Sequence, residues 1–410
     1  MTSPQTLVPE IRFEGFSSAW ERHRLSEFAN FSRGNGLSWA DVQSDGVNEC
    51  ILYGNLYTDY GMIAESVKYR TNLVPSNPAF SQYGDVLIPG SDTTPTGLAR
   101  ATSIEKTGVL LGGDINILRP NGNVNGSCLS LAINANKSEL IKLIKGITVR
   151  HIHNDDIKDV EVAFPVAKDE QEKLVGVFKK IDYLINLHQR KQNHLKSVKK
   201  SMLEKMFPRD GANVPEIRFA GFTNAWEQRK WSNTVDISTD MVDPKTGLYD
   251  ELPHVAPGNI ESFTGRLFDN VKLVKDENLI SGKFRFSAGD IIYGKINPQL
   301  GKYVFAAFSG LTSADAYVLN AKNGIDQKFL YAVLQTKDFF DYSVSVSKRS
   351  GMPKINRDEL NAYSFAAPST AEQAKIGSFL LGIDNLITLH QCKCDKLKEI
   401  KNSLLQKMFV

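Results

Sequence analysis

The sequence has few cysteines, no long apolar run and no strong excess of either charge. Of its four cysteines, Cys50 and Cys128 are isolated, while Cys392 and Cys394 stand two apart in a helical pattern and so point to different faces. We interpret all four as reduced thiols without a metal or redox role. The longest apolar stretch, residues 376–387, is interrupted by Asp384 and is far shorter than the roughly 18 residues that a membrane span needs.

The charge balance and the first residues set further limits. A net charge of +3, from 49 Lys and Arg against 46 Asp and Glu, does not by itself indicate a nucleic-acid binder, so the distribution of basic residues must carry that inference. Residues 1–10 have neither a basic start nor an apolar core, so we expect no secretory signal and a cytoplasmic location. A length of 410 residues suggests two or three domains.

Catalytic motifs are also lacking. The chain has no phosphate-binding GxxxxGK[ST] loop and no GxSxG nucleophile elbow. Residues 77–80, Asn-Pro-Ala-Phe, lack the second proline of the adenine methyltransferase motif, and we interpret them as a turn. His151 and His153 could share one face of a strand, but no third metal ligand is evident nearby. We therefore predict no catalytic residue, no metal and no cofactor in this chain.

What the sequence does contain is a long internal repeat. Residues 8–21 return as 214–227, residues 84–88 as 289–293 and residues 170–207 as 372–409, at offsets between 202 and 206. About half of the positions in the last pair are identical. Because solenoid repeats are only about 20 to 50 residues long, this period indicates duplication of a whole domain. Between these anchors, residues 30–160 and 235–360 share little beyond the Gly-Asp turn at 84–85 and 289–290.

The two variable stretches mix short β-like runs with Gly, Asn and Pro turns and occasional helix. The runs are residues 86–88, 115–118, 271–274 and 317–319. We predict the α+β class, with two domains related by a pseudo-two-fold axis and separated by two long antiparallel helices that form a coiled-coil-like spacer. The predicted boundaries are 1–165 and 210–367 for the two domains and 166–209 and 368–410 for the two helices.

Both copies of the long repeat carry a helical pattern. Residues 170–207 contain no proline, one glycine and apolar residues at heptad spacing, which predicts helices packed along a seam. Pro368, Ser369 and Glu372 predict a capping-box start for the second helix. The predicted seam comprises Leu174, Ile181, Leu184, Leu195 and Val198 in the first helix and Ile376, Ile383, Leu386, Leu397 and Ile400 in the second, with Val177, Met202, Phe379 and Leu404 at the same spacing.

Polar residues interrupt this pattern at the same place in both copies. The first copy has His188 and Lys191, and the second has His390 and Lys393. Two interpretations remain open. Either these residues lie within the seam and fix its register at some cost in stability, or they lie off the seam and are solvated.

A helix of 38 residues is about 57 Å long, so we expect a spacer. If a two-fold axis relates the halves, the two helices run antiparallel. Residues 205–207 lead through a short linker into residues 214–215. The end of the chain, residues 407–409, repeats residues 205–207, and residues 8–9 near its start match residues 214–215. Joining the end of the chain to its start therefore recreates the internal junction.

Basic residues gather in a few places. Residues 187–209 contain seven basic residues against one acidic residue, Glu204, which suits phosphate or an acidic partner but is equally typical of a solvated helix face. Loops near the Gly-Asp strands offer Lys and Arg to phosphates and Ser, Thr, Asn and Gln to base edges. The candidate DNA-contact residues are Ser91, Thr93, Thr94, Thr96 and Arg100 in the first half, and Tyr293, Lys295, Asn297, Gln299, Lys348, Arg349, Lys354 and Arg357 in the second.

A variable domain followed by a long helix, twice over, resembles the specificity subunit of type I restriction–modification enzymes. The more specific motifs are Glu-Cys-Ile-Leu-Tyr-Gly-Asn-Leu-Tyr-Thr at residues 49–58, Gly-Asp-Ile-Ile-Tyr-Gly-Lys-Ile-Asn-Pro at residues 289–298, and Ile-Asp-x-Leu-Ile at 181–185 and 383–387. The resemblance covers essentially the whole chain. It implies a non-catalytic protein whose two domains are target-recognition domains for double-stranded DNA.

The resemblance also implies partners. Each recognition domain reads one half of a bipartite sequence, and the helices fix the separation of the domains and dock methyltransferase subunits. Endonuclease/translocase subunits complete the restriction complex, and S-adenosylmethionine, ATP and Mg²⁺ belong to those partners. A spacer of about 57 Å against ~34–36 Å per DNA turn predicts a split, asymmetric target with unread base pairs between its halves. The alternative is a scaffold or adaptor that does not bind DNA and uses the helix pair to gather other proteins.

Overall fold

The computed structural model describes residues 7–209, 211–348 and 351–410, and the chain divides into two compact units. Unit 1 comprises residues 1–186 and 394–410, and unit 2 comprises residues 187–393. The two long helices, α7 (Lys168–Lys205) and α12 (Thr370–Met408), therefore each contribute one part to each unit. No helix among the described residues is long and apolar enough to cross a membrane.

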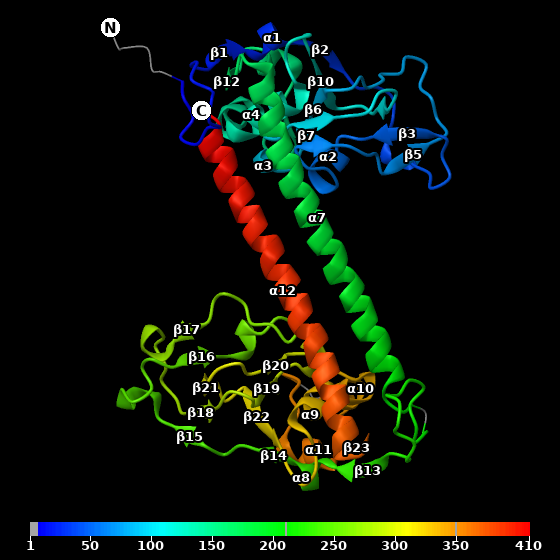
Figure 1. The fold of residues 1–410 in the computed structure, drawn as a ribbon, viewed down its shortest axis with the longest axis vertical. Helices are drawn as coiled ribbons and strands as arrows, with labels where there is room; N and C mark the ends of the chain where they lie inside the picture. Colours follow the sequence, from blue (N-terminus) through cyan, green and yellow to red (C-terminus); the bar gives the residue numbers. More distant parts are fainter. Residues whose placement is uncertain (1–6, 210, 349–350) are drawn as a thin grey trace. The chain divides into compact units, whose positions relative to one another are not determined.

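Unit 1 holds the first α+β domain (Figure 1). Its strands and short helices are β1 (Glu21–Arg24), α1 (Leu25–Phe28), β2 (Ala29–Arg33), η1 (Trp39–Asp41), β3 (Asn48–Ile51), α2 (Asn55–Thr58), β4 (Ile63–Ala64), β5 (Tyr69–Thr71), β6 (Asp85–Pro89), β7 (Ser91–Asp92), α3 (Pro95–Leu98), β8 (Thr102–Ile104), β9 (Leu110–Leu111), β10 (Ile115–Pro120), α4 (Gly126–Ala135), α5 (Lys137–Leu143), β11 (Arg150–His151), α6 (Asn154–Ile157) and β12 (Glu161–Phe164). The sheets are β2-β10-β6-β8-β4, β5-β3-β9, β1-β12 and β11-β7.

Unit 2 holds the second domain. Its elements are β13 (Glu227–Lys230), α8 (Trp231–Thr234), β14 (Val235–Ile237), β15 (Met241–Val242), η2 (Pro244–Thr246), β16 (Pro253–Val255), η3 (Pro257–Asn259), β17 (Lys272–Leu273), η4 (Val274–Asp276), β18 (Lys283–Phe286), β19 (Ile291–Gly294), η5 (Pro298–Leu300), β20 (Tyr303–Phe305), β21 (Gly310–Thr312), β22 (Ala316–Ala321), α9 (Gln327–Val333), α10 (Lys337–Val346), α11 (Arg357–Ala362) and β23 (Ser364–Ala367). The sheets are β14-β22-β19-β20, β15-β18-β21-β16-β17 and β13-β23.

The α+β prediction is confirmed, and the central strand of each domain follows the predicted Gly-Asp turn. Gly84 and Gly289 have φ of 88° and 96°, a region that favours glycine. Along β6, Val86 and Ile88 belong to the core packed on α4 and α7, while Leu87 faces a second core under β3 and β9. This alternation repeats along β19, because strand side chains point to opposite faces in turn. Both central strands are therefore buried on both sides.

The predicted internal junction occurs in both units. In unit 2, the N–H of Ile217 donates to the carbonyl of Lys205 at 2.9 Å, and Phe207 packs edge-on against Trp226. In unit 1, residues distant in sequence repeat the arrangement. The N–H of Ile11 donates to the carbonyl of Lys407 at 2.9 Å, and Phe409 packs edge-on against Trp20. The interpretation that the ends of the repeat match the internal junction is confirmed by these contacts.

A buried Arg–Glu pair anchors the start of each long helix. Arg12 donates to Glu170 at 2.7 Å in unit 1, and Arg218 donates to Glu372 at 2.7 Å in unit 2. The capping-box prediction for the second helix is only half right. The carbonyl of Ser369 accepts from the first turn of α12, but the carboxylate of Glu372 faces Arg218.

The helices pack antiparallel within each unit. Each helix was predicted to contribute two lines of seam residues, and the second line is displaced by one residue. Leu174, Ile181, Ile376 and Ile383 are buried as predicted, whereas Leu386 and Ile400 are 45% and 41% exposed. The second line of seam contacts lies one residue later at each heptad, at Phe178, Ile185, Gln192, Lys199 and Met206 and at Leu380, Ile387, Cys394, Lys401 and Met408. The apolar pattern predicted the wrong residues for this second line, because three of the true seam residues, Gln192, Lys199 and Lys401, are polar.

The structure also decides whether the polar residues that interrupt the helical pattern lie within the seam or off it. His188 and His390 lie within the seam, with their Nδ1 atoms 2.8 Å apart, while Lys191 and Lys393 are exposed. The histidines are therefore seam residues and the lysines are solvated. Cys392 is exposed and Cys394 is buried, as their spacing predicted, and all four cysteines are free.

Candidate nucleic-acid interface

Three cationic side chains gather at the end of β19 in unit 2. Lys295 Nζ lies 5.2 Å from the centre of the Tyr317 ring, and the Arg357 guanidinium lies 5.6 Å from the same ring. Lys354 pairs through its backbone with Ile296. The chain brings these residues together because the N–H of Ile355 donates to the carbonyl of Lys295 at 3.0 Å. We call Lys295, Lys354 and Arg357 the cationic cluster.

The electrostatics of this cluster suit an anion. Burial lowers the pKa of Lys295, and the charges of Lys354 and Arg357 lower it further against the opposing effect of Asp315. Like charges held this close favour a ligand that neutralises them. Arg357 also has a structural role, because its guanidinium donates to the carbonyls of Ile237 and Ser238, both at 2.8 Å.

Polar candidates flank the cluster. Asn297 has φ of 49° and accepts a hydrogen bond from Gln299 at 3.3 Å, and both follow β19. Lys348 is exposed, whereas Arg349 lies outside the described residues. Tyr293 is a correction: it is 3% exposed within the core, so it is removed from the candidate contact residues. Burial raises its pKa to about 12. The alternation of β19 turns this side chain toward α10, where it packs edge-on against Phe339.

The matching strand end in unit 1 has a different chemistry. Thr93, Thr94 and Thr96 are exposed, and Thr94 caps α3. Ser91 is buried, and its hydroxyl donates to Asp114 at 3.2 Å and lies 2.9 Å from His151 Nδ1. Arg100 is partly buried and donates to the carbonyl of Leu56 at 2.9 Å, and burial lowers its pKa. Of the five candidates in unit 1, the three threonines are the exposed ones, and buried Ser91 is removed from the candidate contact residues as Tyr293 is.

A feature that sequence reasoning missed lies beside these threonines. Trp39, Tyr53 and Tyr57 line a pocket of about 510 Å³ together with Asp114. Tyr53 and Tyr57 fall within the motif at residues 49–58, so that motif was the available signal. Trp39 is distant in sequence and could not be assigned to the same place without the fold.

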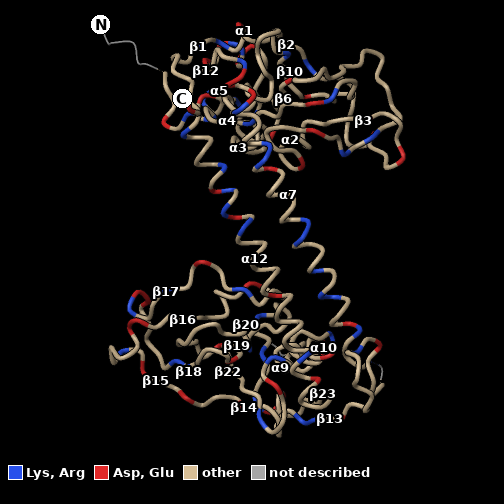
Figure 2. Tube along the Cα trace, viewed as in Figure 1, with Lys and Arg blue, Asp and Glu red and all other residues tan. Residues whose placement is uncertain are grey.

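The basic segment of residues 187–209 is only partly free. Lys199 is buried in an ion pair with Asp384, Lys205 pairs with Glu216 at 2.7 Å, and Arg209 lies 3.7 Å from Glu204. The exposed members are Arg190, Lys191, Lys196, Lys200 and Arg209. Figure 2 shows Lys and Arg recurring along α7. This segment combines a solvated face with structural pairs.

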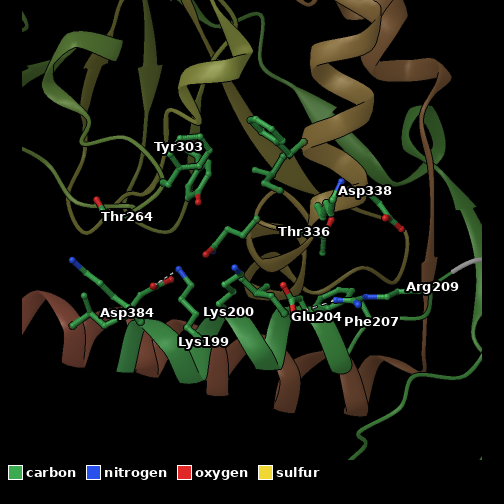
Figure 3. Close-up of a pocket in the computed structure, with 18 of the residues that line it drawn as sticks. Lys199, Lys200, Glu204, Phe207, Arg209, Thr264, Tyr303, Thr336, Asp338 and Asp384 are labelled. Atoms are coloured by element: carbon green, nitrogen blue, oxygen red, sulfur yellow. Dashed lines mark hydrogen bonds and ion pairs between the residues drawn. The ribbon is translucent and has the colours of Figure 1, made fainter. Parts of the chain in front are cut away.

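The Lys199–Asp384 pair lies at one wall of a cavity of about 540 Å³ in unit 2. Figure 3 shows Lys199 and Asp384 joined on the helices, with Tyr303 and Thr336 on the opposite wall. Burial raises the pKa of Asp384, and the Lys199 charge opposes that rise.

Metal-ligating groups do not assemble in the described parts of the chain, where no three His, Cys, Asp or Glu side chains are placed to hold an ion. His151 and His153 stack with ring centres 6.1 Å apart. His151 contacts Ser91, which is consistent with a structural role.

Known proteins resemble this chain in sequence and fold. A family model described as the type I restriction modification DNA specificity domain matches residues 18–197 and again residues 241–401. The EcoDI specificity subunit, a type I restriction enzyme component from Escherichia coli, is 27% identical over 256 residues, 57% of this chain and 56% of that protein. The chain thus aligns with little more than half of this relative's length.

Two further comparisons span nearly the whole chain. The MjaVIII specificity subunit from Methanocaldococcus jannaschii is 19% identical over 409 residues, 94% of this chain and 91% of that protein. The crystal structure of a type I restriction–modification system S subunit from M. genitalium has a TM-score of 0.71 at 14% identity, over 98% of this chain and 99% of that one. This likeness shows a shared fold, and the two family matches confirm the duplication.

Proposed function

Because the chain belongs to the type I restriction modification DNA specificity family, we propose that it is the sequence-reading subunit of a type I restriction–modification complex. Unit 1 reads one half of a split, asymmetric target in double-stranded DNA, and unit 2 reads the other half. The two long helices set the number of unread base pairs between the halves. Methylation, ATP-driven translocation and cleavage belong to partner subunits, which bind S-adenosylmethionine, ATP and Mg²⁺.

One observation carries this proposal: the two domains share a frame but present different side chains at the same strand end. The pairing of β6 with β10 in unit 1 repeats as the pairing of β19 with β22 in unit 2, which makes Gly90 equivalent to Lys295. By the same alignment, His151 is equivalent to Lys354 and Asn154 to Arg357. A shared frame with different residues at this strand end is what two readers of different DNA sequences require.

Exchange of the variable residues tests this proposal. Replacing residues 30–155 with the matching stretch of a relative should change one half of the methylated sequence and leave the other half and the spacing unchanged. The measurement is sequencing of methylated adenines after co-expression with the methyltransferase subunit. Exchange of residues 235–360 is the matched control and should change the other half. Methylation altered in both halves by one exchange contradicts the proposal, and absence of sequence-dependent DNA affinity supports the scaffold alternative.

Exposed apolar residues on the outer face of the helices are the proposed docking surface for the methyltransferase subunits. Leu386 and Leu389 are 45% and 46% exposed on α12. Replacing both with Asp should weaken binding of the methyltransferase subunit by about tenfold or more, because it would bury two unpaired carboxylates in the interface. Asn385→Asp, on the same turn, is the matched control. Co-purification and titration measure the effect, and equal binding by all variants would place the docking surface elsewhere.

A further inference from the structure

The aromatic pocket of unit 1 is a second feature of the strand end, separate from the exposed threonines. Trp39 is 61% exposed and Tyr53 is 37% exposed, although both rings line the same cavity of about 510 Å³. Large aromatic side chains in the open are costly to hydrate, and their concentration around one concavity indicates a binding role.

Local structure holds these rings in place. The N–H of Leu52 donates to Asn55 Oδ1 at 2.9 Å, which forms the turn that presents Tyr53 and starts α2 with Tyr57. Trp39 packs edge-on against Tyr69, with ring centres 5.2 Å apart. The pocket is therefore built by the fold.

A carboxylate completes the pocket. Asp114 has φ of 57°, and its two oxygens accept from Arg33 at 2.9 Å and from Ser91 at 3.2 Å. An ionised carboxylate accepts up to about four hydrogen bonds, so Asp114 keeps acceptor capacity toward the cavity.

Unit 2 shows that the aromatic residues are not needed for the fold. The parallel pairing of β3 with β9 repeats as β16 with β21, and the N–H of Ala256 donates to Asn259 as Leu52 donates to Asn55. In this alignment Tyr53 and Tyr57 correspond to Pro257 and Glu261, in the same turn. The turn forms without aromatic rings, so the rings in unit 1 serve another purpose.

We propose that this pocket binds a single unstacked nucleobase of the DNA held by unit 1, with Trp39 and Tyr53 stacking on the base and Asp114 accepting from its exocyclic amino group. The carboxylate acceptor favours adenine, cytosine or guanine over thymine, because thymine has no exocyclic amino group. The inference rests on the proposed function. It adds that unit 1 recognises DNA by stacking, whereas unit 2 relies on its cationic cluster.

Intrinsic fluorescence gives a direct test. All four tryptophans lie in the described parts of the chain, and Trp20, Trp226 and Trp231 are at most 4% exposed, so Trp39 is the exposed reporter. The full chain is titrated with short single-stranded oligonucleotides of deoxycytidine, deoxyadenosine or thymidine, and with an abasic oligonucleotide of equal length. Base-containing oligonucleotides should quench Trp39, with deoxycytidine and deoxyadenosine tighter than thymidine, and the abasic one should not.

Variants separate stacking from the mere presence of a reporter. Trp39→Phe should lose the quenching but keep the affinity, since a ring remains. Trp39→Ala should weaken binding by roughly five- to 150-fold, the range expected for one base–aromatic stack. Tyr83→Ala is the matched control, because Tyr83 is 67% exposed but precedes β6, away from the pocket. It should bind as the unchanged chain does.

The possible outcomes separate failure of the proposed function from failure of the pocket assignment alone. If the full chain binds neither these oligonucleotides nor a pool of random duplexes, the proposed function and the pocket both fail. If it binds DNA but Trp39 is not quenched, or the abasic oligonucleotide quenches equally, only the pocket assignment is overturned. Unchanged affinity of Trp39→Ala has the same consequence.

Discussion

The two units differ in what they place on a shared frame. Both have a buried central strand after a Gly-Asp turn, an Arg–Glu pair at the helix start and a Phe–Trp contact at the junction. At the strand end, unit 2 gathers Lys295, Lys354 and Arg357, whereas unit 1 has Gly90, His151 and Asn154 in the equivalent positions and an aromatic pocket beside them. The frame is therefore separable from the reading surface.

A second difference lies in the ion pairs of the helix seam. Lys199–Asp384 in unit 2 and Lys401–Asp182 in unit 1 are equivalent in the repeat. The first pair is buried on both sides, at 9% and 8% side-chain exposure, while Asp182 is 29% exposed. A buried carboxylate without its partner is far costlier than one in contact with water.

The largest expected effect follows from this comparison. Lys199→Met should lower the free energy of unfolding by about 3–5 kcal/mol near pH 8, since it leaves Asp384 buried and unpaired. Lys401→Met is the matched control and should cost less than Lys199→Met, because Asp182 keeps contact with water. Chemical denaturation measures both.

The pH dependence of that effect has a definite sign. Burial already raises the pKa of Asp384 in the folded state, and loss of Lys199 raises it further. Because the pKa of this carboxyl group is higher in the folded state than in the unfolded state, protonation favours the folded state. The loss of unfolding free energy in Lys199→Met should therefore shrink as the pH falls from about 8 toward 5. A defect equal in size at both pH values, or equal in the two variants, would show that the seam pairs do not differ as described.

The next effect concerns the cationic cluster. Replacing Lys295 and Lys354 together with Ala should weaken DNA binding and reduce the slope of log affinity against log salt by about 0.9 for each phosphate that the protein no longer neutralises. His151→Ala, at the position equivalent to Lys354, should leave the slope unchanged. Binding titrations at several salt concentrations measure it. An unchanged slope in the double variant would remove the cluster from the phosphate-binding surface.

The sequence predicts the repeated frame, which comprises the central strands, the junctions and the long helices, better than it predicts the side chains at the strand ends. The Gly-Asp strands and the junctions were predictable because local sequence repeats there. The seam line through Gln192 and Lys199 was not predictable, because polar residues on this line interrupt the apolar periodicity from which a helix seam is recognised. The pocket was predictable only in part: Tyr53 falls within the motif at residues 49–58, but Trp39 and Asp114 join it through the pairing of β3 with β9 and through loops outside that motif.

The smallest expected effect tests the histidine pair in the unit 2 seam. His188 and His390 both have pKa values lowered by burial, with Lys191 and Lys393 nearby and, for His390, His188 itself adding to the effect. A histidine with a lowered folded pKa takes up its proton more readily when unfolded. Stability should therefore decline as the pH falls below about 6.5, the value of free histidine.

Replacing both histidines with Gln should flatten this decline while keeping a polar contact in the seam. His194→Gln is the matched control, because it makes the same substitution at an exposed position of α7. Unfolding free energies between about pH 7 and pH 5 give the comparison. The same decline in all three proteins would show that the seam histidines do not titrate with folding. A flatter curve in the double variant alone would mean that the repeated histidine makes the helix seam of unit 2 sensitive to acid.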